Sequence, residues 1–202
     1  MANGIKTSDL VNRFYHLAQT SVYQVKLQPP AAVVSYLNAN GFNYNANGLD
    51  VELRCKMAKL PSSGFNTHEQ SNDFMGVSEK MAYRREFEDV EFDFYVDNKY
   101  DVVEMFDGWM EYISGHDNNT FDDPYRGYRM NYPDTYKTNV FISKFEKGFG
   151  EDDKSYQLDY TMVNAFPIST FPMQVSYDDS DILLYSVKFN FQRFTRRRSR
   201  VD

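Results

Sequence analysis

Residues 89–97 alternate without interruption between apolar side chains and acidic or aromatic ones. The even positions are all apolar: Val90, Phe92, Phe94 and Val96. The odd positions carry four carboxylates and one phenol: Asp89, Glu91, Asp93, Tyr95 and Asp97. A period of two residues is the geometry of a β-strand, in which successive side chains point to opposite faces. The segment therefore predicts a strand with one face in a core and the other lined by carboxylates.

A helical pattern begins directly after this strand. Val102, Phe106, Trp109 and Ile113 recur at spacings of three or four residues, which places them on one side of an α-helix. Gly115 follows the last of them and suits the left-handed conformation that ends many helices. We expect one helix of about 14 residues here.

The rest of the chain shows mostly strand patterns. Strands are expected over 22–27, 49–60, 77–96, 138–145, 156–165 and 182–194. Short helices are expected from Ser8 to near Gln19 and from Pro30 to Gly41. Turn-forming residues predict loops over 38–48, 61–76 and 116–133. Together these elements predict a mainly β domain, a two-sheet antiparallel β-sandwich or barrel with one central helix and a short N-terminal helix.

Composition supports a single domain over residues 1–202. Aromatic residues make up 17% of the chain, a bias that favours sheets. The mean hydropathy is −0.63, and no apolar run is long enough to cross a membrane. The N-terminus lacks the pattern of a signal peptide, and the single cysteine, Cys55, excludes a disulfide within the chain.

Charge is distributed very unevenly along the chain. Between Glu86 and Asp123 there are 13 acidic residues and one basic residue, a net charge of −12, whereas the whole chain carries −7. Such density is typical of a solvated acidic face, and the alternative is a surface that repels polyanions. The last ten residues, 193–202, hold five arginines. We interpret this basic tail as a frayed, solvated end or a contact to an acidic neighbour, in preference to a nucleic-acid site.

No motif predicts an active site, a cofactor site or a metal site. His16, His68 and His116 lack the spacing of zinc ligands, and the acidic stretch after His116 lacks the glycine and the final glutamate of an EF-hand loop. Cys55 falls on the apolar face of the strand expected over 49–60, so we interpret it as a core residue. The carboxylates are too numerous to single out a glycosidase pair, and a carboxylate-dependent hydrolase remains a minor alternative.

Three stretches of the chain, taken in order, resemble the tail tube proteins of contractile-tailed bacteriophages. They are RCKMAKLPSSG (54–64), RREFEDVEFDFYVDNKYDVVEMFDGWMEYISG (84–115) and VNAFPISTFPMQVSYDDSDILLYSVKFNFQRF (163–194). The family pattern is a CK-x-x-x-LP strand end, then an R-x-F-acidic-acidic strand that runs into a helix with an FxxW turn. An aromatic-proline step, an aspartate-rich turn and a final strand of alternating aromatics follow. Residues 8–27 fit as well, so the resemblance covers most of the chain.

The resemblance implies a structural virion protein without enzymatic activity or cofactor. Copies would form hexameric rings that stack into the inner tube of a contractile tail, with DNA passing through the lumen without specific binding and no membrane involved. The partners would be the sheath, baseplate and tail-terminator proteins, and assembly in the host bacterial cytoplasm would place the protein in the virion tail. Two sets of residues would then have roles. The acidic lumen face would comprise Asp89, Glu91, Asp93 and Asp97, and the ring-stacking loop would contain Phe65, His68 and Phe74.

Parts of the chain exceed the family pattern. The extra residues lie in 29–47, in 64–76, in 116–133 and at the arginine-rich end. Two related roles therefore stay open beside the main tube subunit: a baseplate protein of the same fold that starts the tube, and the tube component of a bacterial secretion system.

Overall fold

One long strand is shared by two antiparallel sheets in this protein. The structure is a computed structural model that describes residues 18–70, 76–115, 130–146, 155–177 and 181–201. In chain order, its elements are β1 (Tyr23–Leu27), α2 (Ala31–Ala39), α3 (Tyr44–Leu53), β2 (Cys55–Ala58), β3 (Ser63–Gln70), β4 (Glu79–Phe87), β5 (Val90–Tyr95), α4 (Asp101–Ser114), α5 (Pro133–Tyr136), β6 (Thr138–Phe145), β7 (Ser155–Thr170), β8 (Leu184–Asn190) and β9 (Arg193–Val201).

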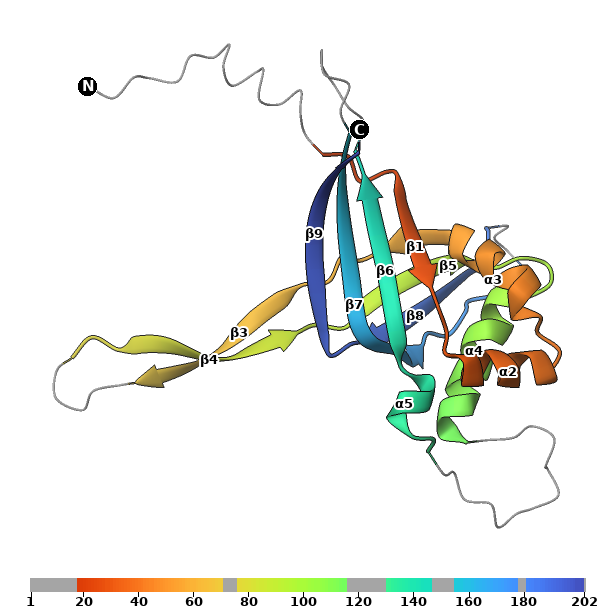
Figure 1. The fold of residues 1–202 in the computed structure, drawn as a ribbon, viewed down its shortest axis with the longest axis horizontal. Helices are drawn as coiled ribbons and strands as arrows, with labels where there is room; N and C mark the ends of the chain where they lie inside the picture. Colours follow the sequence, from red (N-terminus) through yellow and green to blue (C-terminus); the bar gives the residue numbers. More distant parts are fainter. Residues whose placement is uncertain (1–17, 71–75, 116–129, 147–154, 178–180, 202) are drawn as a thin grey trace.

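Strand β7 links the two sheets (Figure 1). The first sheet has the order β1-β6-β7-β9, the second has the order β7-β8-β5-β2, and every neighbouring pair is antiparallel. Residues 155–163 of β7 pair with β9, whereas residues 166–170 pair with β8. Asn164 lies between the part of β7 that pairs with β9 and the part that pairs with β8. Its φ is 56°, a left-handed conformation that asparagine tolerates better than most residues. This change in backbone direction lets one strand serve both sheets.

The core is aromatic and is closed by α4. Phe92 of β5 packs edge-on against Phe189 of β8, with ring centroids 5.5 Å apart. Phe106 and Trp109 of α4 pack edge-on against the same Phe189 ring, each at 6.0 Å. The Trp109 Nε1–H donates to the Tyr136 carbonyl at 3.1 Å, so the one polar group of the indole is satisfied. The predicted core face of the strand around Phe92 is confirmed.

The predicted helix after that strand is also confirmed. α4 has 14 residues and ends before Gly115, which has a φ of 66°. Val102, Phe106 and Trp109 are buried, as the helical spacing predicts. The short helix expected from Pro30 is present as α2, and Gly41 beyond it has a φ of 98°.

The region before β2 differs from its prediction. A loop was expected over 38–48 and a strand over 49–60, but residues 44–53 form α3 and only the later part of the expected strand is present, as β2 from Cys55 to Ala58. Tertiary contacts explain the helix: the Glu52 carboxylate accepts the Leu27 N–H at 2.7 Å, and the Tyr44 hydroxyl donates to the Leu27 carbonyl at 2.9 Å. Both contacts require α3 to lie along β1, and this docking overrides the weak local preference of the sequence.

The expected loop over 61–76 is wrong as well, because its first half is a strand. β3 pairs with β4 from Ser63 opposite Phe87 to Gln70 opposite Glu79. The two strands form a hairpin, here called the arm (residues 63–87), that extends away from both sheets (Figure 1). The predicted strand over 77–96 is therefore two strands, β4 in the arm and β5 in the body, separated at Glu88 and Asp89.

The basic tail is a strand and not the frayed end that was predicted. Residues 193–201 form β9, which pairs with β7 from Val163 opposite Arg193 to Ser155 opposite Val201. The chain turns sharply at residues 191–192, so the strand expected over 182–194 ends as β8 at Asn190. The expected strands over 22–27, 138–145 and 156–165 are confirmed as β1, β6 and β7.

Two remaining expectations lie wholly or largely outside the described residues. These are the N-terminal helix over 8–19 and the loop over 116–133, of which only residues 130–133 are described. Within the described ranges, no helix is long and apolar enough to cross a membrane. The mainly β, two-sheet fold class is confirmed.

Candidate functional surfaces

Three of the four carboxylates assigned to an acidic face lie together on the outer face of the second sheet. Asp89, Glu91 and Asp93 alternate with the buried residues of β5 and are half-buried themselves. The alternation that predicted them has a simple cause, since the inner positions face the aromatic core and the outer positions face away from it.

Each of these carboxylates is paired with a group from a distant part of the chain. The Asp93 carboxylate accepts the Ser186 hydroxyl at 2.6 Å, and Asp89 lies 3.2 Å from the Lys188 ammonium. Glu91 forms an ion pair and hydrogen bond with Lys59, and this hydrogen bond raises the pKa of Lys59. The outer face of the second sheet therefore carries three carboxylates and two ammonium groups, a much lower charge density than the sequence of β5 alone implies.

Asp97 has a different role from the other three residues. Its carboxylate accepts the Asp101 N–H at 3.0 Å, at the point where α4 begins. Arg54 lies 3.3 Å from Asp97 and 3.6 Å from Asp101, so one guanidinium bridges both carboxylates and offsets one of their two negative charges. A carboxylate at a helix N-terminus is stabilised by the exposed N–H groups there. The geometry thus places Asp97 in the connection from β5 to α4.

The acidic segment 86–123 is split by the second sheet. The carboxylates of β5 lie on its outer face, whereas α4 covers its inner face. Asp107 of α4 accepts the hydroxyl of Tyr185, an inner-face residue of β8, and burial raises the pKa of Tyr185 above its usual range. Within the described part of the segment, the excess of acidic residues is therefore divided between two surfaces.

The outer face of the first sheet is basic, which sequence reasoning missed. The pairing register places Lys26, Arg193 and Arg197 on the same side as Asp159. Asp159 is already occupied, because its carboxylate accepts the Ser143 hydroxyl and the Gln157 amide, each at 2.6 Å. The signal that could have revealed this face is the alternation within 193–201, where Phe194 packs toward the core and the flanking odd positions point outward.

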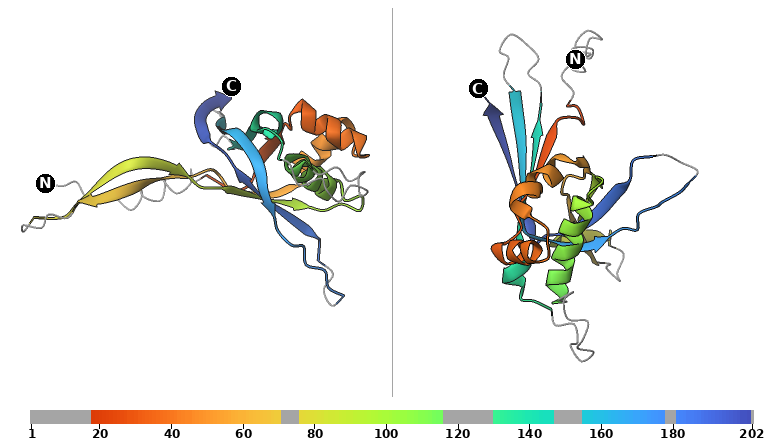
Figure 2. Two further views of the ribbon diagram at one scale, coloured as in Figure 1. Left: turned by 90° about the horizontal axis from the view of Figure 1, so that it is seen from below. Right: turned by 90° about the vertical axis from the view of Figure 1, so that its right-hand side faces the viewer.

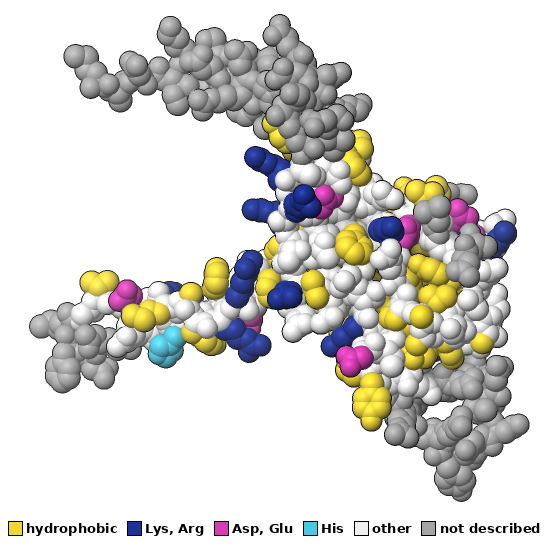
Figure 3. All heavy atoms as spheres, in the orientation of Figure 1, with side chains coloured by type: hydrophobic (Ala, Val, Ile, Leu, Met, Phe, Trp, Pro, Cys, Tyr) yellow, Lys and Arg dark blue, Asp and Glu magenta, His cyan; other side chains and the backbone are white. Residues whose placement is uncertain are grey.

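The arm is anchored at its base and exposed along the rest of its length. At the base, the Arg85 guanidinium stacks on the rings of Phe87 and Phe194, at 5.1 and 5.9 Å, and donates to the Ser63 hydroxyl at 2.9 Å. Figure 3 shows basic side chains gathered where the arm leaves the body. Beyond the base, Phe65 is 64% exposed and the opposite strand also presents apolar side chains to solvent.

The residues assigned to ring stacking lie in this arm as far as they are described. Phe65 and His68 belong to β3 and are exposed, while Phe74 lies outside the described residues. Sequence reasoning missed Met81 and Tyr83 of β4, which are 48% and 68% exposed. The sequence signal that could have identified them is the presence of apolar residues in 77–87, in contrast to the polar sequence of β3, with which β4 pairs.

Nucleophilic and metal chemistry find no support in the described part of the chain. Cys55 is half-buried, its thiol donates to the Met57 carbonyl at 3.4 Å, and burial raises its pKa to about 12. A thiol that stays protonated at neutral pH is a poor nucleophile. Among the described residues, no group of three His, Cys, Asp or Glu side chains is placed to hold a metal ion.

Comparison with known proteins identifies the family to which this chain is similar. A sequence model of the phage tail tube protein family matches residues 18–197. No curated protein sequence matches the chain.

Solved structures show the same fold at low sequence identity. A chain of the sheath–tube complex of PVC, an extracellular contractile injection system, in its extended state is 14% identical, with a TM-score of 0.53 over 96% of this chain and 99% of that one. A chain of the anti-feeding prophage cap is 15% identical, with a TM-score of 0.55 over 91% and 93%. A chain of the anti-feeding prophage baseplate is 12% identical, with a TM-score of 0.51 over 89% and 97%.

Proposed function

Because this chain belongs to the phage tail tube protein family, we propose that it forms the inner tube of a contractile tail. Copies assemble into hexameric rings, and the rings stack into a hollow conduit through which DNA leaves the particle. The observation that carries the proposal is the family match over residues 18–197. Members of this family are structural proteins, so the chain is not an enzyme.

Unpaired sheet edges support assembly from copies of one chain. In the described structure, β1 and β2 end the strand path and β9 pairs only with β7. An exposed strand edge presents N–H and C=O groups that another chain can complete. Closed rings result when the same contact repeats around a rotation axis.

The outer face of the second sheet is our candidate for the channel wall. Asp89, Glu91 and Asp93 with their partners Lys59 and Lys188 form a group with one excess negative charge per subunit, and Lys56 lies at its edge, over the Tyr95 ring. Repeated around a ring, that charge repels the DNA backbone, which carries about one negative charge per 1.7 Å of axis. The channel therefore guides DNA without holding it, and Asp97 supports this face indirectly, through the start of α4.

The arm is our candidate for the contact between rings. A two-stranded hairpin with no further cover is at best marginally stable in water, so its apolar side chains favour a position against another chain. Phe65 and Tyr83 supply that apolar surface. The sheath, baseplate and terminator proteins are the further partners we propose, in line with the particles in which similar folds occur.

Negative-stain electron microscopy of the purified protein tests the proposal. Long tubes with six-fold cross-sections are expected. A protein that stays monomeric at every concentration would contradict the proposal.

A baseplate role for the same fold is the second candidate. The similar chains include one from a baseplate, and its TM-score of 0.51 is close to the 0.53 of the sheath–tube chain. A baseplate protein that starts a tube would form single rings that do not stack by themselves. The length of the assemblies in the same micrographs therefore separates the two roles.

A further inference from the structure

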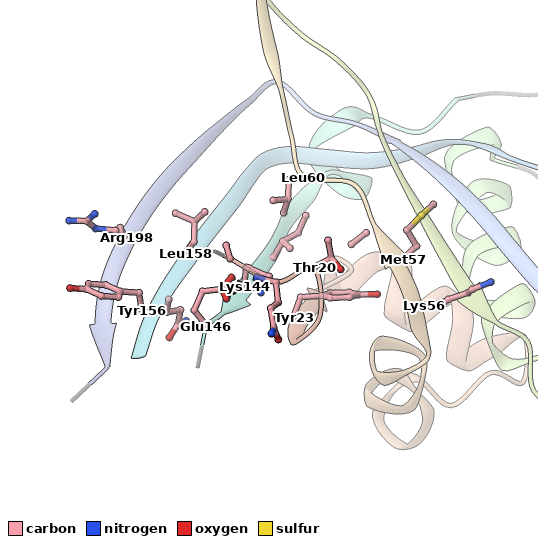
Figure 4. Close-up of a pocket in the computed structure, with 15 residues that line it drawn as sticks. Thr20, Tyr23, Lys56, Met57, Leu60, Lys144, Glu146, Tyr156, Leu158 and Arg198 are labelled. Atoms are coloured by element: carbon pink, nitrogen blue, oxygen red, sulfur yellow. Dashed lines mark hydrogen bonds and ion pairs between the residues drawn. The ribbon is translucent and has the colours of Figure 1, made fainter. Parts of the chain in front are cut away.

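A pocket of about 780 Å³ opens between β2 and the first sheet (Figure 4). The start of β1, the end of β6 and the start of β7 form one wall, and β2 with the approach to the arm forms the other. Its lining includes Tyr23, Met57, Leu60 and Leu158, so much of the surface is apolar. A largely apolar pocket of this size that is open to solvent is a candidate binding site for another molecule or chain segment.

The charged groups around the pocket are mostly basic. Lys144 and Glu146 pair with each other at 2.8 Å. Lys56 lies 5.7 Å from the centre of the Tyr95 ring and Arg198 lies 5.6 Å from that of Tyr156, and within the described residues neither cation has a carboxylate partner. The occupant that suits this pocket is therefore both apolar and acidic.

The segment between β7 and β8 has that chemistry. Val175 is 85% exposed, Ile182 is 68% exposed and Tyr177 is fully exposed. Residues 171–187 contain three aspartates and no lysine or arginine. Figure 2 shows the described ends of this segment projecting from the body, in a direction different from that of the arm.

We propose that the pocket of one copy receives residues 173–177 and 181–183, the described ends of the β7–β8 segment, from the neighbouring copy in the ring. This inference rests on the proposed assembly and adds the contact that closes it. The pocket and the segment are different surfaces of one chain, so the contact is heterologous and repeats around a rotation axis. Asp181 meets the basic rim at Arg198, and the apolar side chains of the segment fill the floor.

Charge complementarity selects this occupant over the arm. Counted over the full sequence, residues 63–87 of the arm carry four acidic and three basic residues, a net charge of −1, whereas residues 171–187 carry −3. The β7–β8 segment therefore offers more negative charge to Lys56 and Arg198 than the arm does. The arm also leads away from the pocket on its own chain.

Reciprocal charge reversal tests the contact. Arg198→Glu or Asp181→Arg, alone, should weaken ring formation at least about tenfold, because each variant opposes like charges across a partly desolvated contact. An equimolar mixture of the two variants should recover rings to within about threefold of the wild type. In an alternating ring of six, every contact then holds either the original pair or the swapped pair. Analytical ultracentrifugation against concentration gives the association constants.

Arg197→Glu is the matched control, because its side chain lies on the opposite face of the same strand. Mixing it with Asp181→Arg should bring no recovery. Thermal unfolding of each variant verifies that the fold is retained, which is expected because both arginines are exposed.

The failures of the two proposals are distinguishable. Wild-type protein that forms rings while Arg198→Glu and Asp181→Arg assemble normally would overturn this contact and leave the tube proposal standing. Wild-type protein that never assembles would overturn both. Thiol crosslinking gives an independent readout: Tyr177→Cys should crosslink to Leu60→Cys of another copy. A crosslink from Phe65→Cys to Leu60→Cys in its place would assign the pocket to the arm and refute the proposal.

Discussion

Strands β4 and β5 are separated by only two residues, yet β5 is largely buried and β4 is almost entirely exposed. In β5, Val90, Phe92 and Phe94 are at most 2% exposed. In β4, every residue from Glu79 to Glu86 is exposed, although the strand contains methionine and tyrosine. Both segments have strand-forming sequences, so the difference comes from what covers them.

The covering elements explain the contrast. β5 lies between β8 and β2 and is covered by α4, whereas β4, within the described residues, pairs with β3 alone. The apolar residues of the body are therefore buried by the same chain, whereas those of the arm remain exposed and are available to contact another chain. The body should determine the stability of the subunit, and the arm should determine how subunits associate.

The largest expected effect is on the stability of the subunit. It appears when a phenylalanine is replaced by alanine in the body and, for comparison, in the arm. Phe92→Ala removes a fully buried ring and should lower the free energy of unfolding by about 3–5 kcal/mol. Phe65→Ala in the arm should change it by less than about 0.5 kcal/mol, because the ring is mostly exposed. Urea denaturation followed by tryptophan fluorescence measures both. Equal losses would show that the arm is part of the cooperative core.

The reverse contrast is expected for assembly. Phe65→Ala combined with Tyr83→Ala should raise the protein concentration needed for tubes at least about tenfold, since a few apolar contacts dominate most interfaces. Electron micrographs should then show single rings in place of tubes. Tyr132→Ala, a similar loss of exposed aromatic surface outside both the arm and the pocket, is the control. Tubes of normal length from the double variant would remove the arm from the ring-to-ring contact.

A charge reversal on the body separates stability from DNA passage. Glu91→Lys places two lysines side by side and should cost about 1 kcal/mol or less, as expected for a partly exposed pair. It also changes the group formed by Asp89, Glu91, Asp93, Lys59 and Lys188 from one excess negative to one excess positive charge per subunit. Particles with this subunit should release DNA more slowly after triggering, as a time course of dye-stained DNA would record.

Glu69→Lys makes the same charge change on the arm and serves as the control for that experiment. Its release rate should match the wild type unless the arm faces the channel. A normal rate with Glu91→Lys would show that the outer face of the second sheet does not line the DNA path.

The smallest effect should be a pH dependence confined to the body. Burial raises the pKa of Glu52 above its usual value, so the folded state binds its proton more tightly than the unfolded state does. Stability from this group is present at low pH and is lost as pH rises through the raised pKa. Glu52→Gln should therefore gain in melting temperature relative to the wild type as pH increases from about 4 to 7, by differential scanning fluorimetry.

Regular periodicity was the part of the sequence that predicted structure well. The two-residue alternation around Phe92 and the helical spacing through Trp109 named core residues correctly, because each pattern is long and agrees with the element that covers it. Short or ambiguous patterns failed. The alternation of Leu49, Val51 and Leu53 suggested a strand, but bonds from Glu52 and Tyr44 to β1 stabilise a helix there.

Pairing between strands could not be predicted from local patterns. β3 is polar and rich in turn formers, and it is a strand because β4 completes its hydrogen bonds. β9 is rich in arginine, and it is a strand because β7 extends far enough to pair with it. Such partners are set by register and topology, which single segments do not encode.

By itself, the sequence determined which side chains could form the core and where negative charge is dense along the chain. Only the tertiary structure decided where that charge ends up. The second sheet separates the carboxylates of β5 from those of α4, and Lys59, Lys188 and Arg54 come from other segments to pair with them. The reason is physical: periodicity is a local property of a chain, whereas electrostatic compensation acts through space between residues that only folding brings together.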